Sequence, residues 1–163
     1  MEAVEPLHMP PMVLEQGKTP AFLLAWRREP VKGWEGRLAV PHSQVDVRGE
    51  HVHGLMYRWS PPEHFTKLPG VDYGAVPRPA PDEDDAPPLR MPPMVLYKGD
   101  HPAFLLAWMP VTSGERRAWE AYLAIPPGRT DPAKVAYARV GAGTVRSLPE
   151  VDYSSVPRTP LPS

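Results

Sequence analysis

Apolar side chains recur at every second position in several short segments of this chain, which is the period of a β-strand. In the segment GWEGRLAV, the apolar Trp34, Leu38 and Val40 share one face, and the charged Glu35 and Arg37 share the other. A strand with this alternation buries one face and leaves the other in solvent. The segment therefore predicts a half-buried strand.

The segment PAFLLAW lacks this contrast between faces. Phe22, Leu24 and Trp26 alternate with Ala21 and Leu23, so both faces of the strand are apolar. We expect such a strand to be covered on both sides.

Further segments predict the remaining strands of the same unit. VHGLMYRW predicts a strand with Leu55, Tyr57 and Trp59 on one face. The shorter segments MVL (residues 12–14) and PPEHFTKL supply an opening strand and a short last strand.

The same unit occurs twice in the chain. Residues 9–26 and 91–108 are identical at 14 of 18 positions, at an offset of 82. The similarity continues from GWEGRLAVP to AWEAYLAIP, and the copies close with LPGVDYGAVPR and LPEVDYSSVPR. Chance does not produce this agreement, so the chain carries an internal duplication of a unit of roughly 70 residues.

The duplication predicts two modules and a linker. We expect the first module at residues 9–78 and the second at residues 91–158. Between them, residues 79–90 (PAPDEDDAPPLR) combine prolines with four consecutive acids, so we expect an extended and solvated linker. Consecutive carboxylates on an extended chain point in alternating directions, which argues against a metal site in this run.

Composition favours an all-β fold. The chain has 25 prolines among 163 residues, and proline lacks an amide hydrogen and clashes with the preceding turn of a helix. Cysteine is absent, which fits a reducing compartment and excludes disulfides, thiolate zinc sites, iron–sulfur clusters and thiol nucleophiles. The excess of arginine over lysine is typical of a GC-rich bacterial genome.

No apolar stretch reaches the roughly 20 residues that a membrane span needs. The start of the chain, MEAVEPLHMPP, has neither the basic nor the apolar region of a signal peptide. We therefore expect a cytoplasmic protein that does not bind membranes.

The order of the expected strands resembles the SH3-like small barrels, a group that includes SH3 and Tudor-type modules. The resemblance rests on a strand pair with bulky residues around a turn (AWRREPVKGWEGRL) and on a late P-x-x-F-x-x-L segment, Pro62, Phe65 and Leu68. It implies two tandem barrels, each closed on itself. The acidic ligand loop and the paired tyrosines of signalling SH3 domains are not evident, so the resemblance does not extend to their proline-peptide groove.

The closing VDYxxVPR signature extends beyond a minimal barrel. Because its prolines cannot pair within a central strand, we expect an extended surface segment. Our hypothesis is that its apolar residues cover the second face of the FLLAW strand; these are Val71, Tyr73, Val76, Val151, Tyr153 and Val156. Contact between the two modules is an alternative use of that face.

Barrels of this group bind through aromatic residues and loops at one rim, because rings offer a large contact area and stack on bases or cations. The candidate binding residues are therefore six aromatic and four basic side chains: Trp34, Tyr57, Trp59, Trp119, Tyr122, Tyr137, Arg27, Arg28, Arg116 and Arg117. Trp and Tyr also dominate the cores of small domains, so a core role competes for each ring. Trp59 and Tyr122 favour binding, because neither has an aromatic counterpart in the other copy.

No motif predicts catalysis, a cofactor or a metal. The chain has no GxSxG, GxGxxG or Walker sequence, and VGAGT (residues 140–144) follows a strand but precedes no helix, as a turn would. His51 and His53 have a spacing that suits a metal on a strand, but no third ligand accompanies them.

The sequence therefore predicts a non-catalytic binding or adaptor module with a protein partner. The net charge of −1 argues against a non-specific phosphate binder. Two alternatives remain: a nucleic-acid-associated accessory protein that uses the basic loops and rim aromatics, and a structural subunit of a larger assembly.

Overall fold

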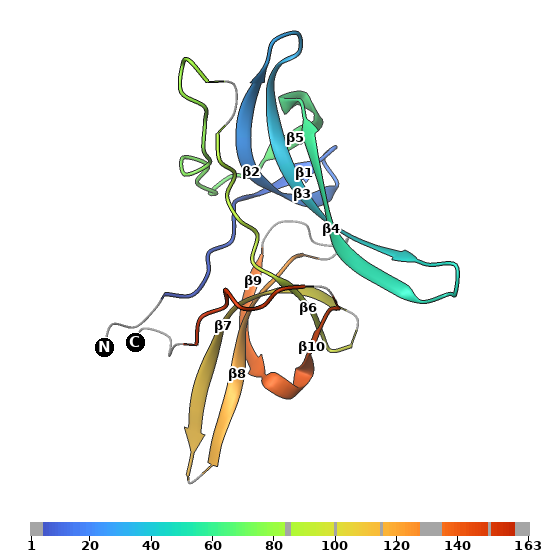
Figure 1. The fold of residues 1–163 in the computed structure, drawn as a ribbon, viewed down its shortest axis with the longest axis vertical. Coiled ribbons are helices and arrows are strands. Elements are labelled where there is room, and N and C mark those ends of the chain that lie inside the picture. Colours follow the sequence, from blue (N-terminus) through green and yellow to red (C-terminus); the bar gives the residue numbers. More distant parts are fainter. Residues whose placement is uncertain are drawn as a thin grey trace. The chain divides into compact units, whose positions relative to one another are not determined.

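The computed structural model describes residues 5–83, 86–99, 101–114, 116–127, 135–149 and 151–158. It contains two five-stranded antiparallel sheets, each in its own compact unit (Figure 1). We call the unit of residues 10–91 and 127 the first module, and the unit of residues 5–9, 92–126 and 135–158 the second module. The predicted all-β fold is confirmed.

The described residues of the two modules contain the same elements in the same order. The first has β1 (Met12–Glu15), β2 (Thr19–Glu29), β3 (Gly33–Val45), β4 (His51–Ser60), the 3₁₀ turn η1 (Pro62–His64) and β5 (Phe65–Lys67). The second has β6 (Met94–Tyr97), β7 (His101–Ser113), β8 (Arg116–Ile125), β9 (Ala136–Gly141), η2 (Ala142–Thr144) and β10 (Val145–Ser147). The strand orders are β4-β3-β2-β1-β5 and β9-β8-β7-β6-β10.

Neither sheet closes into a barrel within the described residues. β4 and β5 are the two edges of the first sheet, and β9 and β10 are those of the second. The 3₁₀ turn that follows β4 leaves the ladder, and β5 then pairs with β1 instead of β4. The closed barrels that we expected are therefore absent, and each module is an open sheet.

The β1–β2 connection shows how local sequence sets the register. Gln16 and Gly17 both have positive φ, 53° and 72°, in the three-residue loop between the paired residues Glu15 and Thr19. Lys98 and Gly99 repeat it at 51° and 94°. Both turns need glycine at the second position, and both copies provide it.

Equivalent side chains fill the core of each module. The first core consists of Val13, Ala21, Leu23, Trp26, Leu38, Val40, Phe65 and Val76. The second consists of Val95, Ala103, Leu105, Ala121, Leu123 and Val156, with Trp108, Ile125 and Val145 packed against it. Leu38 and Val40 are buried as the alternation of β3 predicts. The rest of that prediction is wrong, because Trp34 on the same face is 38% exposed and Glu35, expected in solvent, is 5% exposed.

A β-bulge in β2 changes which face Trp26 occupies. The register with β3 runs through Leu23↔Leu38 and resumes at Ala25↔Arg37, so Leu24 has no partner. The extra residue reverses the alternation beyond it. Trp26 therefore lies in the core with Leu23, and its predicted place on the face of Phe22 and Leu24 is wrong.

The closing segment covers β2 through part of the set that we expected. Val76, Tyr73, Val156 and Tyr153 pack with the cores, whereas Val71 and Val151 belong to neither core cluster. Val76 is 4% exposed and belongs to the core, and the Trp26 amide donates to the carbonyl of Pro77 at 2.9 Å. The Tyr73 hydroxyl donates to the Met12 carbonyl and accepts from the Leu68 amide. The half-buried Tyr73 thus ties the segment to the sheet.

Candidate binding pocket

Two tryptophans on neighbouring strands line a pocket in the first module. Trp26 in β2 packs against Phe65 with ring centroids 5.7 Å apart and is 7% exposed, whereas Trp34 in β3 is 38% exposed. In the ladder between β2 and β3, Trp34 pairs with Arg28. Gly36, two residues further along β3, pairs with Trp26. The two indoles therefore share one face, one inside the core and one at its rim.

The pocket between these rings has a volume of about 200 Å³. Its lining residues are Trp26, Trp34, Pro62, Lys67 and Arg78. They come from four places in the sequence: the β2–β3 hairpin, η1, the end of β5 and the closing segment. Only the tertiary fold brings these places together.

The second module has the equivalent pocket, with a volume of about 280 Å³ and lined by Trp108, Trp119, Ala142 and Arg158. These residues occupy the repeat positions of Trp26, Trp34, Pro62 and Arg78. Trp119 is 44% exposed, close to the value of Trp34. The same site therefore occurs once in each copy of the duplicated unit.

The closing segment places the arginine over the indoles. In the second module a parallel bridge joins Trp108 to Arg158, and the Trp108 amide donates to the carbonyl of Pro157 at 2.8 Å. The Arg158 guanidinium lies 5.6 Å from the centroid of the Trp119 ring, within the range of a cation–π contact. The VPR segment thus carries its arginine to the rim of the pocket.

Among the residues that the structure describes, more cations lie near the rings of the first pocket than near those of the second. Arg78 lies 5.7 Å from the Trp26 ring and 6.0 Å from the Trp34 ring, and Lys67 lies 5.7 Å from Trp26. Arg28 lies 5.1 Å from Trp34. Among the described residues, neither Lys67 nor Arg78 forms an ion pair. Their charges are available to a ligand.

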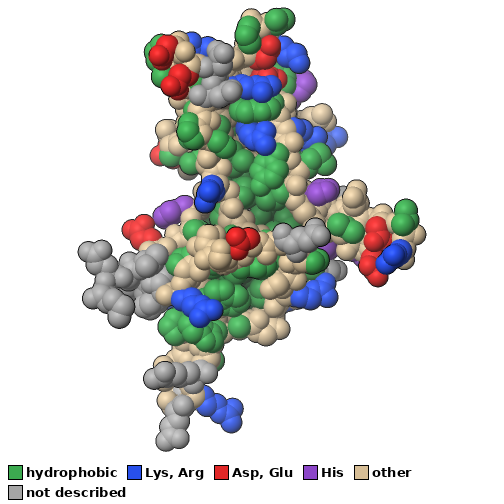
Figure 2. Space-filling view, in the orientation of Figure 1, with side chains coloured by type: hydrophobic (Ala, Val, Ile, Leu, Met, Phe, Trp, Pro, Cys, Tyr) green, Lys and Arg blue, Asp and Glu red, His purple; other side chains and the backbone are tan. Residues whose placement is uncertain are grey.

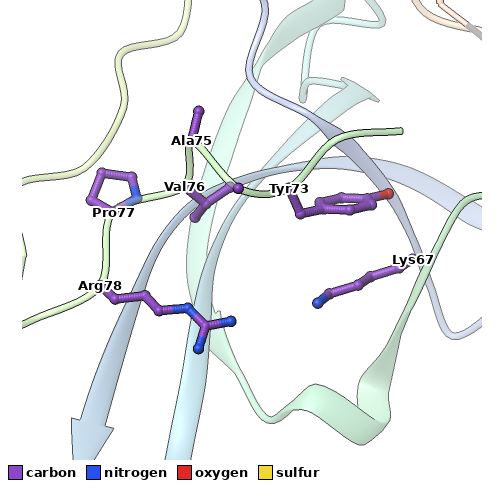
Figure 3. Close-up of a pocket in the computed structure, with 7 residues that line it drawn as sticks. Lys67, Tyr73, Ala75, Val76, Pro77 and Arg78 are labelled. Carbon is purple, nitrogen blue, oxygen red and sulfur yellow. The ribbon is translucent and has the colours of Figure 1, made fainter. Parts of the chain in front are cut away.

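A second depression adjoins this pocket in the first module, with a volume of about 610 Å³. Figure 3 shows the side chains of Lys67 and Arg78 extending toward each other beneath Tyr73 and Val76. Burial raises the pKa of the Tyr73 phenol, against the smaller opposing effect of the hydrogen bond from Leu68. The phenol therefore stays neutral between the cations at physiological pH.

Other candidates lie on the opposite face of the first sheet. The guanidinium of Arg27 lies 4.2 Å from the Trp59 ring, and that of Arg37 lies 5.4 Å from Tyr57 and 5.5 Å from Trp59. Arg27 also binds Glu35 at 2.8 Å, and Glu35 is 5% exposed. Arg27 is thus neutralised by a buried carboxylate.

In the second module, Tyr122 and Tyr137 contact each other on this face, with ring centroids 6.1 Å apart. Burial raises the pKa of Tyr137, and the neighbouring Tyr122 adds to the shift. The structure therefore separates the ten sequence candidates. Trp34, Arg28 and Trp119 lie at the pockets, and the other described rings and Arg27 lie on the opposite face.

The basic residues of the two hairpins do not coincide. Arg27 and Arg28 lie within β2, opposite Glu35 and Trp34. Arg116 and Arg117 pair with Ser113 and Thr112 near the end of a longer hairpin, and the side chain of Arg117 lies outside the described part. The insertion of three residues in the second copy lengthens the hairpin beyond its tryptophans, from β2 ending at Glu29 to β7 ending at Ser113, and so moves its arginines away from the tryptophans.

Sequence reasoning missed Lys67, Arg78, Arg158 and Pro62 as pocket residues. A signal for the arginines was present, since VPR closes both copies unchanged at residues 76–78 and 156–158. That identity was interpreted only as packing. Nothing local distinguishes Lys67 from any exposed lysine.

The His51 and His53 rings stack with centroids 6.3 Å apart. The part of the chain that the structure describes contains no group of three or more potential metal ligands. It also contains no helix with the length and apolarity needed to cross a bilayer.

In comparisons with known proteins, no family model, curated protein or solved structure matched this chain.

Proposed function

We propose that this chain is a non-catalytic binding protein that uses its paired tryptophan pockets to hold an extended segment of a protein partner. The observation that carries the proposal is the repetition of one pocket, with Trp26, Trp34 and Arg78 in the first module and Trp108, Trp119 and Arg158 in the second. A merely structural tryptophan would be buried, whereas Trp34 and Trp119 are 38% and 44% exposed.

We further propose that both modules are SH3-like. The order β4-β3-β2-β1-β5, with a 3₁₀ turn between β4 and β5, supports this assignment. The open edge between β4 and β5 is a departure from the closed form of such barrels.

The chemistry of the pocket favours a ligand with a flat apolar group beside a carboxylate. Indole faces offer apolar contact area, and a guanidinium stacked on a ring still has its edge donors free for a carboxylate. In the first pocket Arg28, Lys67 and Arg78 supply that charge. Acidic segments with a proline or an aromatic side chain fit this description.

The test is binding of an array of random peptides to the full chain and to two double variants. Trp34→Ala with Trp119→Ala removes one wall of both pockets, and Tyr57→Ala with Tyr137→Ala is the matched control on the opposite face. We expect the tryptophan variant to lose the selected peptides at least tenfold, and the control to keep them. Wild-type chain that selects no peptide, or equal losses in both variants, would overturn the proposal.

Labelled random DNA and RNA provide the competing measurement. In the face that Figure 2 shows, Lys and Arg side chains are dispersed among acidic and apolar ones. Nucleic-acid binding would fall steeply with salt, because it releases counterions. Salt-sensitive binding that is lost when Arg28 and Lys67 are replaced would support the nucleic-acid alternative against ours.

A further inference from the structure

Two short segments with one pattern precede the first strands of the modules. They read Leu-His-Met-Pro-Pro at residues 7–11 and Leu-Arg-Met-Pro-Pro at residues 89–93. We call residues 5–9 arm 1 and residues 86–91 arm 2. Arm 1 belongs to the second module, although β1 of the first module follows it, and arm 2 belongs to the first module. Each arm therefore belongs to the module other than the one whose strands follow it, and in this sense the arms are exchanged. Both boundaries between the modules fall between the Met and the first Pro of the pattern.

Each arm makes the same contacts on the module that receives it. The Leu7 amide donates to the Leu106 carbonyl and the Leu89 amide donates to the Leu24 carbonyl, both at 2.9 Å. The Leu7 side chain packs against the second core and the Leu89 side chain against the first. One backbone hydrogen bond and one leucine thus define the docking in both modules.

The β-bulge creates the acceptor for the arm. Leu106 is the bulged residue of β7 and has no partner in β8, just as Leu24 has none in β3. Along the same strand the Leu105 amide donates to Pro93 at 2.9 Å, and the Trp108 amide donates to Pro157 at 2.8 Å. The arm therefore fills the gap on β7 between the residues leading into β6 and the closing segment.

We infer that this gap is a docking groove for an extended Leu-x-Met-Pro-Pro segment, and that a second copy of this chain supplies the segment in trans. The two arms share Leu, Met and both prolines but differ at the exposed position of His8 and Arg90. The groove thus accepts the Leu-x-Met-Pro-Pro pattern with either histidine or arginine at the exposed position. An element already exchanged between equivalent modules makes the same contacts when it comes from another molecule.

The arm of the same chain competes with the arm of a second copy for the groove. A tethered segment has an effective concentration on the order of 1 mM, so the groove is occupied by its own chain in dilute solution. Removing the Leu7 side chain opens the groove of the second module. This surface is distinct from the tryptophan pockets, so the inference stands apart from the proposed function.

The first experiment titrates a fluorescent peptide of residues 5–11 with full-length protein and follows its anisotropy. We expect Leu7→Asp protein to bind the peptide saturably and at least tenfold more tightly than wild type. His8→Ala is the matched control, because it leaves the groove closed. A peptide with Asp in place of Leu should not bind. Equal binding to wild type and Leu7→Asp, or no binding to folded Leu7→Asp, would overturn the groove.

Hydrogen exchange of the wild-type chain tests the docking without a variant. The Leu7 and Leu89 amides should exchange at least tenfold more slowly than those of His8 and Arg90. Unprotected Leu7 and Leu89 amides would contradict the docking, whatever the folding of the variants.

Sedimentation equilibrium tests the source of the segment. Wild-type chain should form a dimer as its concentration approaches the effective concentration of the arm, on the order of 1 mM, and Leu7→Asp should reduce this dimer. A wild-type chain that stays monomeric while the peptide binds the open groove would overturn the second copy as partner, and would point to another protein with the same pattern.

Discussion

The two tryptophan pockets have the same frame and different charge. Where the first has Arg28 and Lys67 beside its rings, the second has Pro110 and Ser147 at the same repeat positions. The arginine of the closing VPR is present in both. The difference separates two contributions: the indole pair and the VPR arginine build the pocket, whereas the other cations adjust what it attracts.

The core beneath the pockets also shows paired differences. Gly36 in the first module corresponds to Ala121 in the second, and Phe65 corresponds to Val145. A Cβ on Gly36 would lie 2.8 Å from the Phe65 ring and 2.8 Å from the Leu23 side chain. The larger ring of the first core therefore requires the smaller residue opposite it.

The largest effect is expected where the two modules differ in a buried charge. Arg27→Met leaves the Glu35 carboxylate, 5% exposed, without its partner and should cost about 3 kcal/mol of unfolding free energy. In the second module Glu120 pairs at 3.1 Å with Arg139, whose side chain is 48% exposed. Arg139→Met should cost no more than about 1 kcal/mol. Urea unfolding with hydrogen exchange resolved by module measures both, and equal costs would break the comparison.

The next largest effect is expected at Gly36, which corresponds to Ala121 in the second module. Gly36→Ala should destabilise the first module by roughly 1–3 kcal/mol, because the added methyl group meets two packed side chains. Adding Phe65→Val reproduces the pair found in the second module and should recover part of the loss. The same urea titration measures both variants. Phe65→Val alone completes the double-mutant cycle, and a double variant whose loss equals the sum of the two single losses would show that the two positions are not coupled.

A smaller effect is expected in ligand charge preference. Lys67→Ser gives the first pocket the residue of the second and should weaken binding of indole-3-acetate to the first pocket about two- to five-fold, since exposed charge pairs contribute at most about 1 kcal/mol. Chemical shifts of the Trp34 and Trp119 indole amides report each pocket separately. The difference in indole-3-acetate affinity between wild type and Lys67→Ser should shrink in high salt. A salt-independent loss would assign the effect to shape instead of charge.

The smallest contrast concerns the half-buried phenols of Tyr73 and Tyr153, one in each module. Burial raises the pKa of Tyr73 and of Tyr153 above 10.0. Between 10.0 and the raised value the folded chain binds more protons than the unfolded chain, so the unfolding free energy should fall as pH rises through this window. Tyr73→Phe and Tyr153→Phe should each reduce that slope similarly. Denaturant titrations at pH 9 to 11 measure it, and unequal slopes would reveal an asymmetry between the closing segments.

The strands themselves were predictable because their signals are local. Alternation placed Leu38 and Val40 in the core, and the apolar FLLAW run was correctly expected to be buried on both faces. The bulge at Leu24 was not predictable, because it depends on how β2 pairs with β3, and it moved Trp26 to the other face. The absence of closure has the same origin, since pairing between edge strands is not encoded within either strand.

The candidate site was predicted only in part. Trp34 and Trp119 were among the candidate binding residues and lie at the pockets, whereas the sequence favoured Trp59 and Tyr122, which lie on the opposite face. Lys67, Arg78 and Arg158 escaped because their role depends on the return path of the closing segment. The binding function itself stays a prediction until the peptide experiments are made.

By itself the sequence determined that this protein is a duplicated, helix-poor chain of alternating strands, because repeats, proline content and side-chain periodicity are properties of neighbouring residues. Only the tertiary structure decided that the arms lie on exchanged modules and that VPR completes the pockets. Those contacts join residues far apart in the chain, through a carbonyl that a bulge leaves unpaired and through rings that two strands bring to one face. Such contacts depend on geometry that no local pattern contains.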